Sequence, residues 1–214
     1  AVEPEVLAAQ ENTARLLEQL GHDVVETHYP VDAQQFAKAY PLFFAERLLP
    51  LKTMIESKTG KPVSETKLLT HFLATLTEHA SHFSEKDIAW GKQYSADLRH
   101  EFQKPFEKFD VLLTPVSPLV APKLDQFDPA WAFNAKTFNT LVGSLKFTGP
   151  VNFAGNPAMS VPLNWGKDSG LPIGSHFIGG QGMDKMLYQL AYELEMARPW
   201  KDKWAPHSAK YASA

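Results

Sequence analysis

The sequence has no cysteine among its 214 residues. Disulfide bonds, cysteine nucleophiles and thiolate metal sites are therefore excluded. Long apolar runs are also lacking, and the run from Val111 to Pro115 is far too short to span a bilayer. No cationic start followed by an apolar stretch is visible, so the sequence shows no secretory signal. We expect a cytoplasmic protein with no membrane partner.

Strong charge of either sign is lacking as well. The formal net charge is -3, which provides no basic field to attract nucleic acid. The sequence contains no GxSxG elbow, no GxxxxGK[ST] phosphate loop and no HExxH pair. Its closely spaced glycines at residues 174–182 lack dinucleotide spacing and are interpreted as turn residues. We therefore expect no cofactor and no nucleic-acid partner.

The eight histidines are scattered, and they do not predict a metal site. His79 and His82 are three residues apart, with His71 two turns earlier, so the three can share a helix face. Because no carboxylate or cysteine stands at ligand spacing, a polar helix surface is the favoured interpretation. His176 stands in a predicted strand, where it is either a hydrogen-bonded core residue or a donor in a pocket. No serine has an activating base nearby in the sequence.

What is present is an ordinary globular composition, with 44% apolar and 21% charged residues. The length suits one domain with a real core. No repeat or linker divides the chain, so we expect a single α/β domain at residues 1–200 and a tail at residues 201–214.

Apolar periodicity and capping signals predict the order of the elements. Pro4 suits a first helical turn and Gly21 a helix stop, whereas Pro41 is expected to interrupt the second helix. Ser84, with Asp87 three residues later, is a predicted N-cap. Helices are expected at residues 4–20, 33–49, about 64–83, about 84–109, 133–147 and 183–198. Strands are expected at residues 22–28, 110–115, 158–163 and 173–179, with a loop at residues 116–130.

The segment at residues 147–179 reads FTGPVNFAGNPAMSVPLNWGKDSGLPIGSHFIG. It resembles the C-terminal consensus of the amidase-signature family, which runs roughly FTxPxNxxGxPAxSVP, a variable turn, then GLPxGxQxxG. The run DVLLTPxxP at residues 110–118 and the closing LAxxxE helix followed by PW are also typical of that family. Matching positions are Phe147, Thr148, Pro150, Asn152, Gly155, Pro157, Ala158, Ser160, Val161, Pro162, Gly170, Leu171, Pro172, Gly174 and Gly179.

The resemblance covers almost the whole chain and implies the C-terminal part of the amidase-signature fold, a mixed sheet flanked by helices. Within the family, the segment from residue 55 onward is most similar to the subgroup that contains 6-aminohexanoate cyclic dimer hydrolase. In this family the nucleophilic serine, a second serine in a cis peptide and a lysine lie in an earlier glycine- and serine-rich segment. These residues contain no such segment. We therefore assign no catalytic residue and expect the isolated chain to be inactive.

The resemblance also implies a substrate-binding role for Leu145, Gly149 and Asn152. In the family, the helix that leads into FTxP borders the acyl pocket. Leu145 and Gly149 are one turn apart and share a face if that helix continues. Relatives that act on glutamine place an acidic residue near Leu145, so a leucine favours an apolar acyl chain. Simple packing is an equally open interpretation. His176 stands where the family usually has glutamine.

Three functions follow as expectations: part of an amide-bond hydrolase, a stand-alone non-catalytic binding or assembly domain, and a glutamine-dependent transamidation subunit. The charge and Leu145 weigh against the third. Phe36, Tyr40, Phe43 and Phe44 cluster on one side of the second helix, either as core or as the wall of a pocket. If half of the fold is absent, we expect this cluster to be exposed and the chain to self-associate.

Overall fold

A computed structural model describes residues 1–124, 130–205 and 208. Its sheet has three antiparallel strands in the order β1-β3-β2: β1 (Val111–Pro115), β2 (Ala158–Trp165) and β3 (Pro172–Gly179). Leu112 lies opposite Ile178, and Ser160 lies opposite His176. The α/β class and three of the four predicted strands are confirmed, and the described strands pair without a parallel neighbour.

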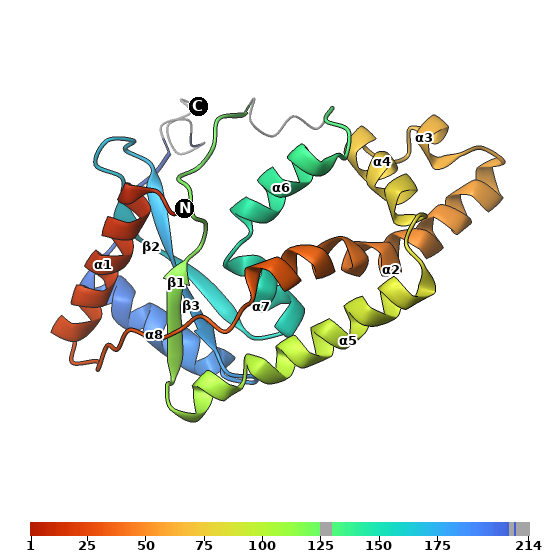
Figure 1. Cartoon of the computed structure of the whole chain (residues 1–214). Helices are drawn as coiled ribbons and strands as arrows, with labels where there is room; N and C mark the ends of the chain where they lie inside the picture. The colour runs from red at the N-terminus through yellow and green to blue at the C-terminus, as the bar shows by residue number, and fades with distance from the viewer. Residues whose placement is uncertain (125–129, 206–207, 209–214) are drawn as a thin grey trace.

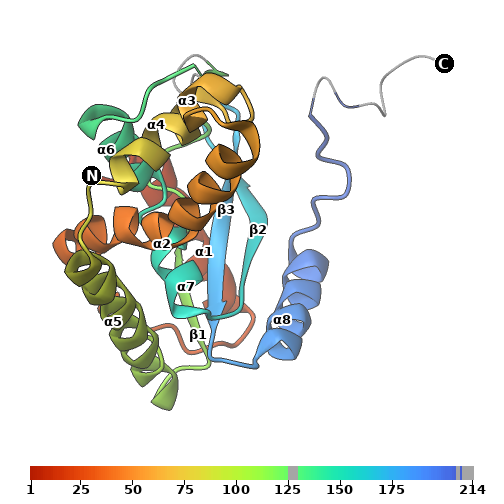
Figure 2. The same cartoon turned by 90° about the vertical axis from the view of Figure 1, so that its right-hand side faces the viewer.

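Helices cover both faces of this sheet (Figures 1 and 2). On one face lie α1 (Pro4–Gln19) and α8 (Asp184–Ala197), which pack through Leu16, Leu187 and Leu194 against Phe177 of β3. On the other face lies α7 (Thr148–Ala154), between the sheet and the helices α2 and α5. Both apolar layers arise because alternate strand residues point to opposite faces of the sheet.

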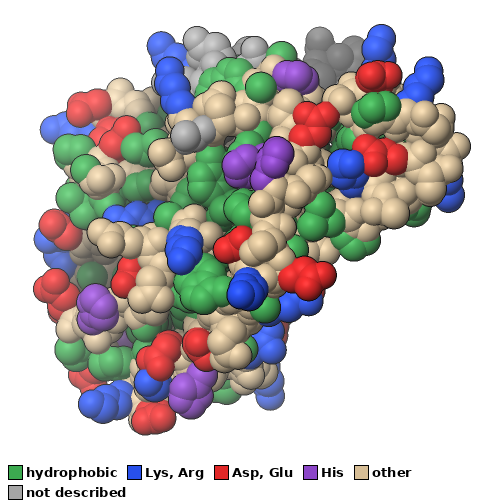
Figure 3. Space-filling view, turned by 45° about the vertical axis from the view of Figure 1, so that its right-hand side comes forward, with side chains coloured by type: hydrophobic (Ala, Val, Ile, Leu, Met, Phe, Trp, Pro, Cys, Tyr) green, Lys and Arg blue, Asp and Glu red, His purple; other side chains and the backbone are tan. Residues whose placement is uncertain are grey.

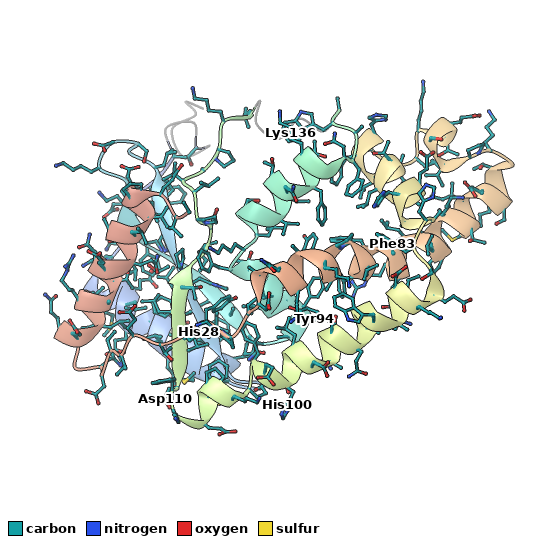
Figure 4. The ribbon with its side chains drawn as sticks, in the orientation of Figure 1. His28, Phe83, Tyr94, His100, Asp110 and Lys136 are labelled. Atoms are coloured by element: carbon teal, nitrogen blue, oxygen red, sulfur yellow. The ribbon has the colours of Figure 1, made fainter. Side chains whose placement is uncertain are left out.

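The remaining helices form an arm that extends away from the sheet (Figure 1). They are α2 (Ala33–Thr59), α3 (Val63–Thr66), α4 (His71–Ala80), α5 (Glu85–Glu101) and α6 (Ala135–Ser144), with a 3-10 turn at Lys104–Glu107. Side chains fill the space between α2 and α5, where Figure 4 labels Tyr94. Burial raises the pKa of Tyr94 to about 12, with a smaller contribution from Asp32.

Local signals explain where several helices begin and end. Asp32 caps α2 by accepting hydrogen bonds from the backbone N–H groups of Gln34 and Gln35 at 2.9 and 3.0 Å. Gly60, with φ +67°, ends α2 in the left-handed conformation that glycine adopts without strain. Ser84 and Asp87 form the predicted capping box at the start of α5. These boundaries are confirmed.

The strand predicted at residues 22–28 is wrong. This segment, in which Figure 4 labels His28, has no regular secondary structure. Val24 and Val25 are 37% and 65% exposed. Their β-branched side chains favour a strand, but a strand also needs a pairing neighbour and a surface to pack against, and this segment has neither among the described residues.

Three helix predictions also need correction. Pro41 does not interrupt α2, since buried neighbours such as Tyr40 and Leu42 hold the helix together around the missing donor. Residues 64–83 form two helices because Lys67, at φ 55°, turns left-handed and ends α3. The helix that opens at Ser84 ends at Glu101 instead of continuing to residue 109.

A buried polar network attaches α1 to the sheet. The Asn164 side chain donates to the carbonyl of Ala9 at 3.0 Å and to Oγ1 of Thr13 at 2.8 Å. Thr13 Oγ1 also lies 2.8 Å from Ser175 Oγ. Arg198, just after α8, donates to Oδ1 of Asn164 at 3.2 Å. One set of hydrogen bonds therefore joins α1, β2, β3 and the end of α8.

The predicted tail has no helix or strand at residues 201–205, and residues 206–207 and 209–214 of it lie outside the described residues. The predicted loop at residues 116–130 contains residues 125–129, which also lie outside them. Within the part of the chain that the structure describes, no helix is long and apolar enough to cross a membrane.

Candidate functional site

The structure brings Leu145 and Gly149 together at the junction of α6 and α7. Regular helix stops at Ser144, before the end of the predicted range, and resumes at Thr148. The Gly149 N–H still donates to the Leu145 carbonyl at 2.8 Å, so the two residues remain one helical turn apart. Leu145 is half-buried and Gly149 is buried. Their expected adjacency is confirmed, although their role in binding substrate is not tested by it.

Gly149 is needed here because an aromatic ring lies against its backbone. A Cβ atom at this position would lie 3.0 Å from Cζ of Phe36 and 3.3 Å from its Cε1. Leu145 packs against the same aromatic cluster. The junction is therefore a close contact between α7 and α2, made by residues 113 positions apart in the sequence.

The aromatic cluster itself is core, and the prediction that it forms an exposed face is wrong. Phe36 and Tyr40 are 3% and 5% exposed, and Phe43 and Phe44 are partly buried against them. Phe153 of α7 supplies the covering ring, with centroids 5.2 Å from Phe36 and 5.7 Å from Tyr40. Burial raises the pKa of the Tyr40 hydroxyl.

Asn152 occupies a different environment from Leu145 and Gly149. It is exposed on α7, and its amide donates to the Thr148 carbonyl at 3.2 Å. Asn156 instead joins the end of α7 to the sheet: its Nδ2 donates to the Gly179 carbonyl at 2.8 Å, and its Oδ1 accepts from Gln103 at 3.1 Å. Sequence analysis missed Asn156, although its place between a glycine and a proline marks a turn.

His176 stands at the centre of a polar row that crosses all three strands. Its Nδ1 lies 3.0 Å from Oγ1 of Thr114 on β1, and Ser160 of β2 lies opposite it in the register. His176 is 5% exposed, and burial lowers its pKa to about 4. It is therefore a neutral, hydrogen-bonded strand residue at physiological pH, which favours the first of the two interpretations considered for it.

The histidines of α4 serve packing. The ring of His79 lies 4.7 Å from that of Phe133 and 5.3 Å from that of Phe83, which Figure 4 labels at the turn into α5. His82 lies next to His79 at 6.4 Å between ring centroids. Among the described residues, no three metal-binding side chains come together.

Two shallow hollows lie beside the sheet. The first is next to the open edge of β2 and is lined by Pro157, Met159, Leu187 and Tyr188, among others. The second lies between residues 116–122 and the start of β3. Neither hollow is lined by Leu145, Gly149 or Asn152. On the face drawn in Figure 3, apolar side chains are exposed between charged ones.

Comparison with known proteins agrees with this architecture. The family model described as "Amidase" matches residues 1–188. A putative amidase AmiC of Mycobacterium leprae is 32% identical over 92% of this chain and 41% of its own length, and that of Mycobacterium tuberculosis strain H37Rv is 31% identical over 97% and 43%. The solved structure of 6-aminohexanoate cyclic dimer hydrolase complexed with substrate is 26% identical, with a TM-score of 0.78 over 94% of this chain and 42% of that one.

This chain thus spans less than half the length of these relatives. The match nevertheless includes the sheet, the α6–α7 junction and the first part of α8, in one continuous region. The resemblance inferred from residues 147–179 is confirmed, and the chain belongs to the amidase family.

Proposed function

We propose that this chain supplies the C-terminal part of an amide-bond hydrolase whose serine nucleophile and activating lysine are provided by a segment outside these 214 residues. The carrying observation is the family match over residues 1–188 in a chain that spans only 41–43% of its amidase relatives. A lysine base needs a pKa depressed by burial, so that segment and this one have to enclose the reacting groups together.

In this proposal the α6–α7 junction forms part of the acyl pocket. Leu145 is half-buried and presents no charged group, so the pocket favours an apolar acyl chain over an amino-acid substrate with an ammonium group. Gly149 keeps the wall thin by letting the Phe36 ring lie against the backbone. Asn152 is exposed and carries an amide that can hydrogen-bond to a substrate.

The substrate class we propose is small linear or cyclic amides. The solved neighbour that is a hydrolase of the 6-aminohexanoate cyclic dimer supports an aliphatic amide, as does Leu145. We propose a cytoplasmic enzyme without a nucleic-acid partner, since a net charge of -3 provides no basic field for one.

A stand-alone binding domain is the competing function, and a component of a transamidation complex is a third. The third has support in a 36% identical stretch of 110 residues shared with one of the subunits of a glutamyl-tRNA(Gln) amidotransferase from Clostridium acetobutylicum. That match covers only 50% of this chain, whereas the amidase matches cover 92% or more. Amide hydrolysis is therefore the function we put forward.

The test is to sequence the DNA upstream of the codon for Ala1 and to express the complete reading frame. We expect an upstream lysine followed by a glycine- and serine-rich segment, and hydrolysis of aliphatic amides by the product. Leu145→Glu in that product is expected to raise KM for apolar amides at least tenfold, whereas Leu145→Met is expected to have little effect. An upstream region without a serine-bearing segment favours the stand-alone domain.

A further inference from the structure

The outward face of α8 carries the largest exposed apolar side chains on any one helix described. Tyr188, Tyr192 and Met196 are 69%, 68% and 81% exposed. They are spaced four residues apart, so they follow one another along a single stripe of the helix. The opposite face of α8 packs on the sheet through Leu187 and Leu194. The stripe therefore adds nothing to the core of this chain.

Two charges on the same face stand at unfavourable ends of the helix. Lys185 lies in the first turn of α8 and Glu195 in the last, and both side chains are exposed. A helix dipole disfavours a cation at its N-terminus and an anion at its C-terminus. Neither residue forms an ion pair with any described residue. At 100° per residue, both fall within the stripe of Tyr188, Tyr192 and Met196.

We propose that a second copy of this chain packs on this face, with the two α8 helices antiparallel and related by a twofold axis at the level of Leu190. Two residues equally far from that axis then face each other. Lys185 of each copy meets Glu195 of the other, and Tyr188 of each meets Tyr192 of the other. The pairing neutralises both unfavourable charges and covers the aromatic stripe from both sides.

The neighbouring surface fits this arrangement. The hollow lined by Pro157, Met159 and Leu187 opens beside Tyr188, so it offers an apolar recess next to the position of the second copy's Tyr192. Tyrosine suits such a contact, because it brings a large apolar ring and few rotatable bonds to an interface. This proposal does not depend on the amidase assignment, and it places the self-association surface on α8 instead of on the buried aromatic cluster of α2.

The experiment is sedimentation equilibrium of the purified chain over a wide concentration range. The wild-type chain is expected to dimerise, and Tyr192→Arg is expected to be monomeric with an unchanged circular dichroism spectrum, because Tyr192 is outside the core. Lys185→Glu and Glu195→Lys are each expected to weaken the dimer at least tenfold. Lys86→Glu, which makes the same charge change at an exposed position on α5, is the matched control and is expected to leave it unchanged.

Mixing the two charge variants gives the sharper result. In a heterodimer of Lys185→Glu with Glu195→Lys, every opposed pair again has opposite charges, so the mixture is expected to dimerise more tightly than either variant alone. The double variant is expected to regain the wild-type affinity. A chain that stays monomeric at all concentrations, or a dimer that is indifferent to Tyr192→Arg and to both reversals, overturns the proposal.

Discussion

The side-chain oxygens of Thr13 and Ser175 lie 2.8 Å apart between α1 and β3, and neither residue is accessible to solvent. Thr13 donates to the Ala9 carbonyl at 3.0 Å and accepts from Asn164 at 2.8 Å. Every polar atom of this threonine side chain is therefore used. The first helix is joined to the sheet by a buried hydrogen-bond network as well as by leucines.

Thr13→Val is expected to destabilise the chain by about 1–3 kcal/mol, since it leaves the Asn164 amide and the Ser175 hydroxyl short of a partner in the core. Urea denaturation followed by circular dichroism measures this change. Thr13→Ser keeps the hydroxyl and is expected to lose much less. Equal stability of the valine variant and the wild type would show that the network contributes nothing.

Gly149→Ala is expected to destabilise the chain by about 1–3 kcal/mol, because the new Cβ would lie 3.0 Å from the ring of Phe36 and force α7 away from α2. Gly143→Ala is the matched control. No atom lies within 4 Å of a Cβ at that helical position, so this second change is expected to stabilise by about 0.4–1 kcal/mol. Two thermal melts of opposite sign are the predicted result, and a stabilising Gly149→Ala would contradict the packing described here.

His176 is expected to make stability depend on pH. Its pKa is about 4 in the folded chain and 6.5 for the model group, so the unfolded chain binds the extra proton first as pH falls. The contribution of this residue is complete above about pH 6.5 and is lost between there and pH 4. Its size is about 3 kcal/mol at one pKa unit per 1.4 kcal/mol.

The measurement for His176 is the unfolding free energy of the wild type and of His176→Gln from pH 4.5 to 8. The wild type is expected to lose stability toward pH 4.5 more steeply than the variant. Since the carboxylates of Glu5, Asp32 and Asp87 have lowered pKa values in both chains, their effects cancel in the difference. Parallel curves would mean that the imidazole is not buried in its neutral form.

Local chemistry explains what the sequence predicts correctly. The capping box at Ser84 and the helix stop at Gly60 depend on neighbours within a few residues, so the pattern alone places them. The strand predicted at residues 22–28 failed because β propensity says nothing about whether a pairing strand is present.

The candidate site shows the same division. The closeness of Leu145 and Gly149 follows from their spacing of four residues, which survives the break between α6 and α7. The ring of Phe36 against Gly149 and the ring of Phe153 over Tyr40 join distant parts of the sequence, so periodicity cannot reveal them. That is why the aromatic cluster was expected at the surface and lies in the core.

Ammonia release from aliphatic amides is the most direct test of the claim that this chain is one part of an amidase. The isolated 214-residue chain is expected to release none above the uncatalysed rate, and the product of the complete reading frame is expected to release it in proportion to enzyme concentration. Turnover by the isolated chain that survives repurification and scales with its concentration would contradict the account.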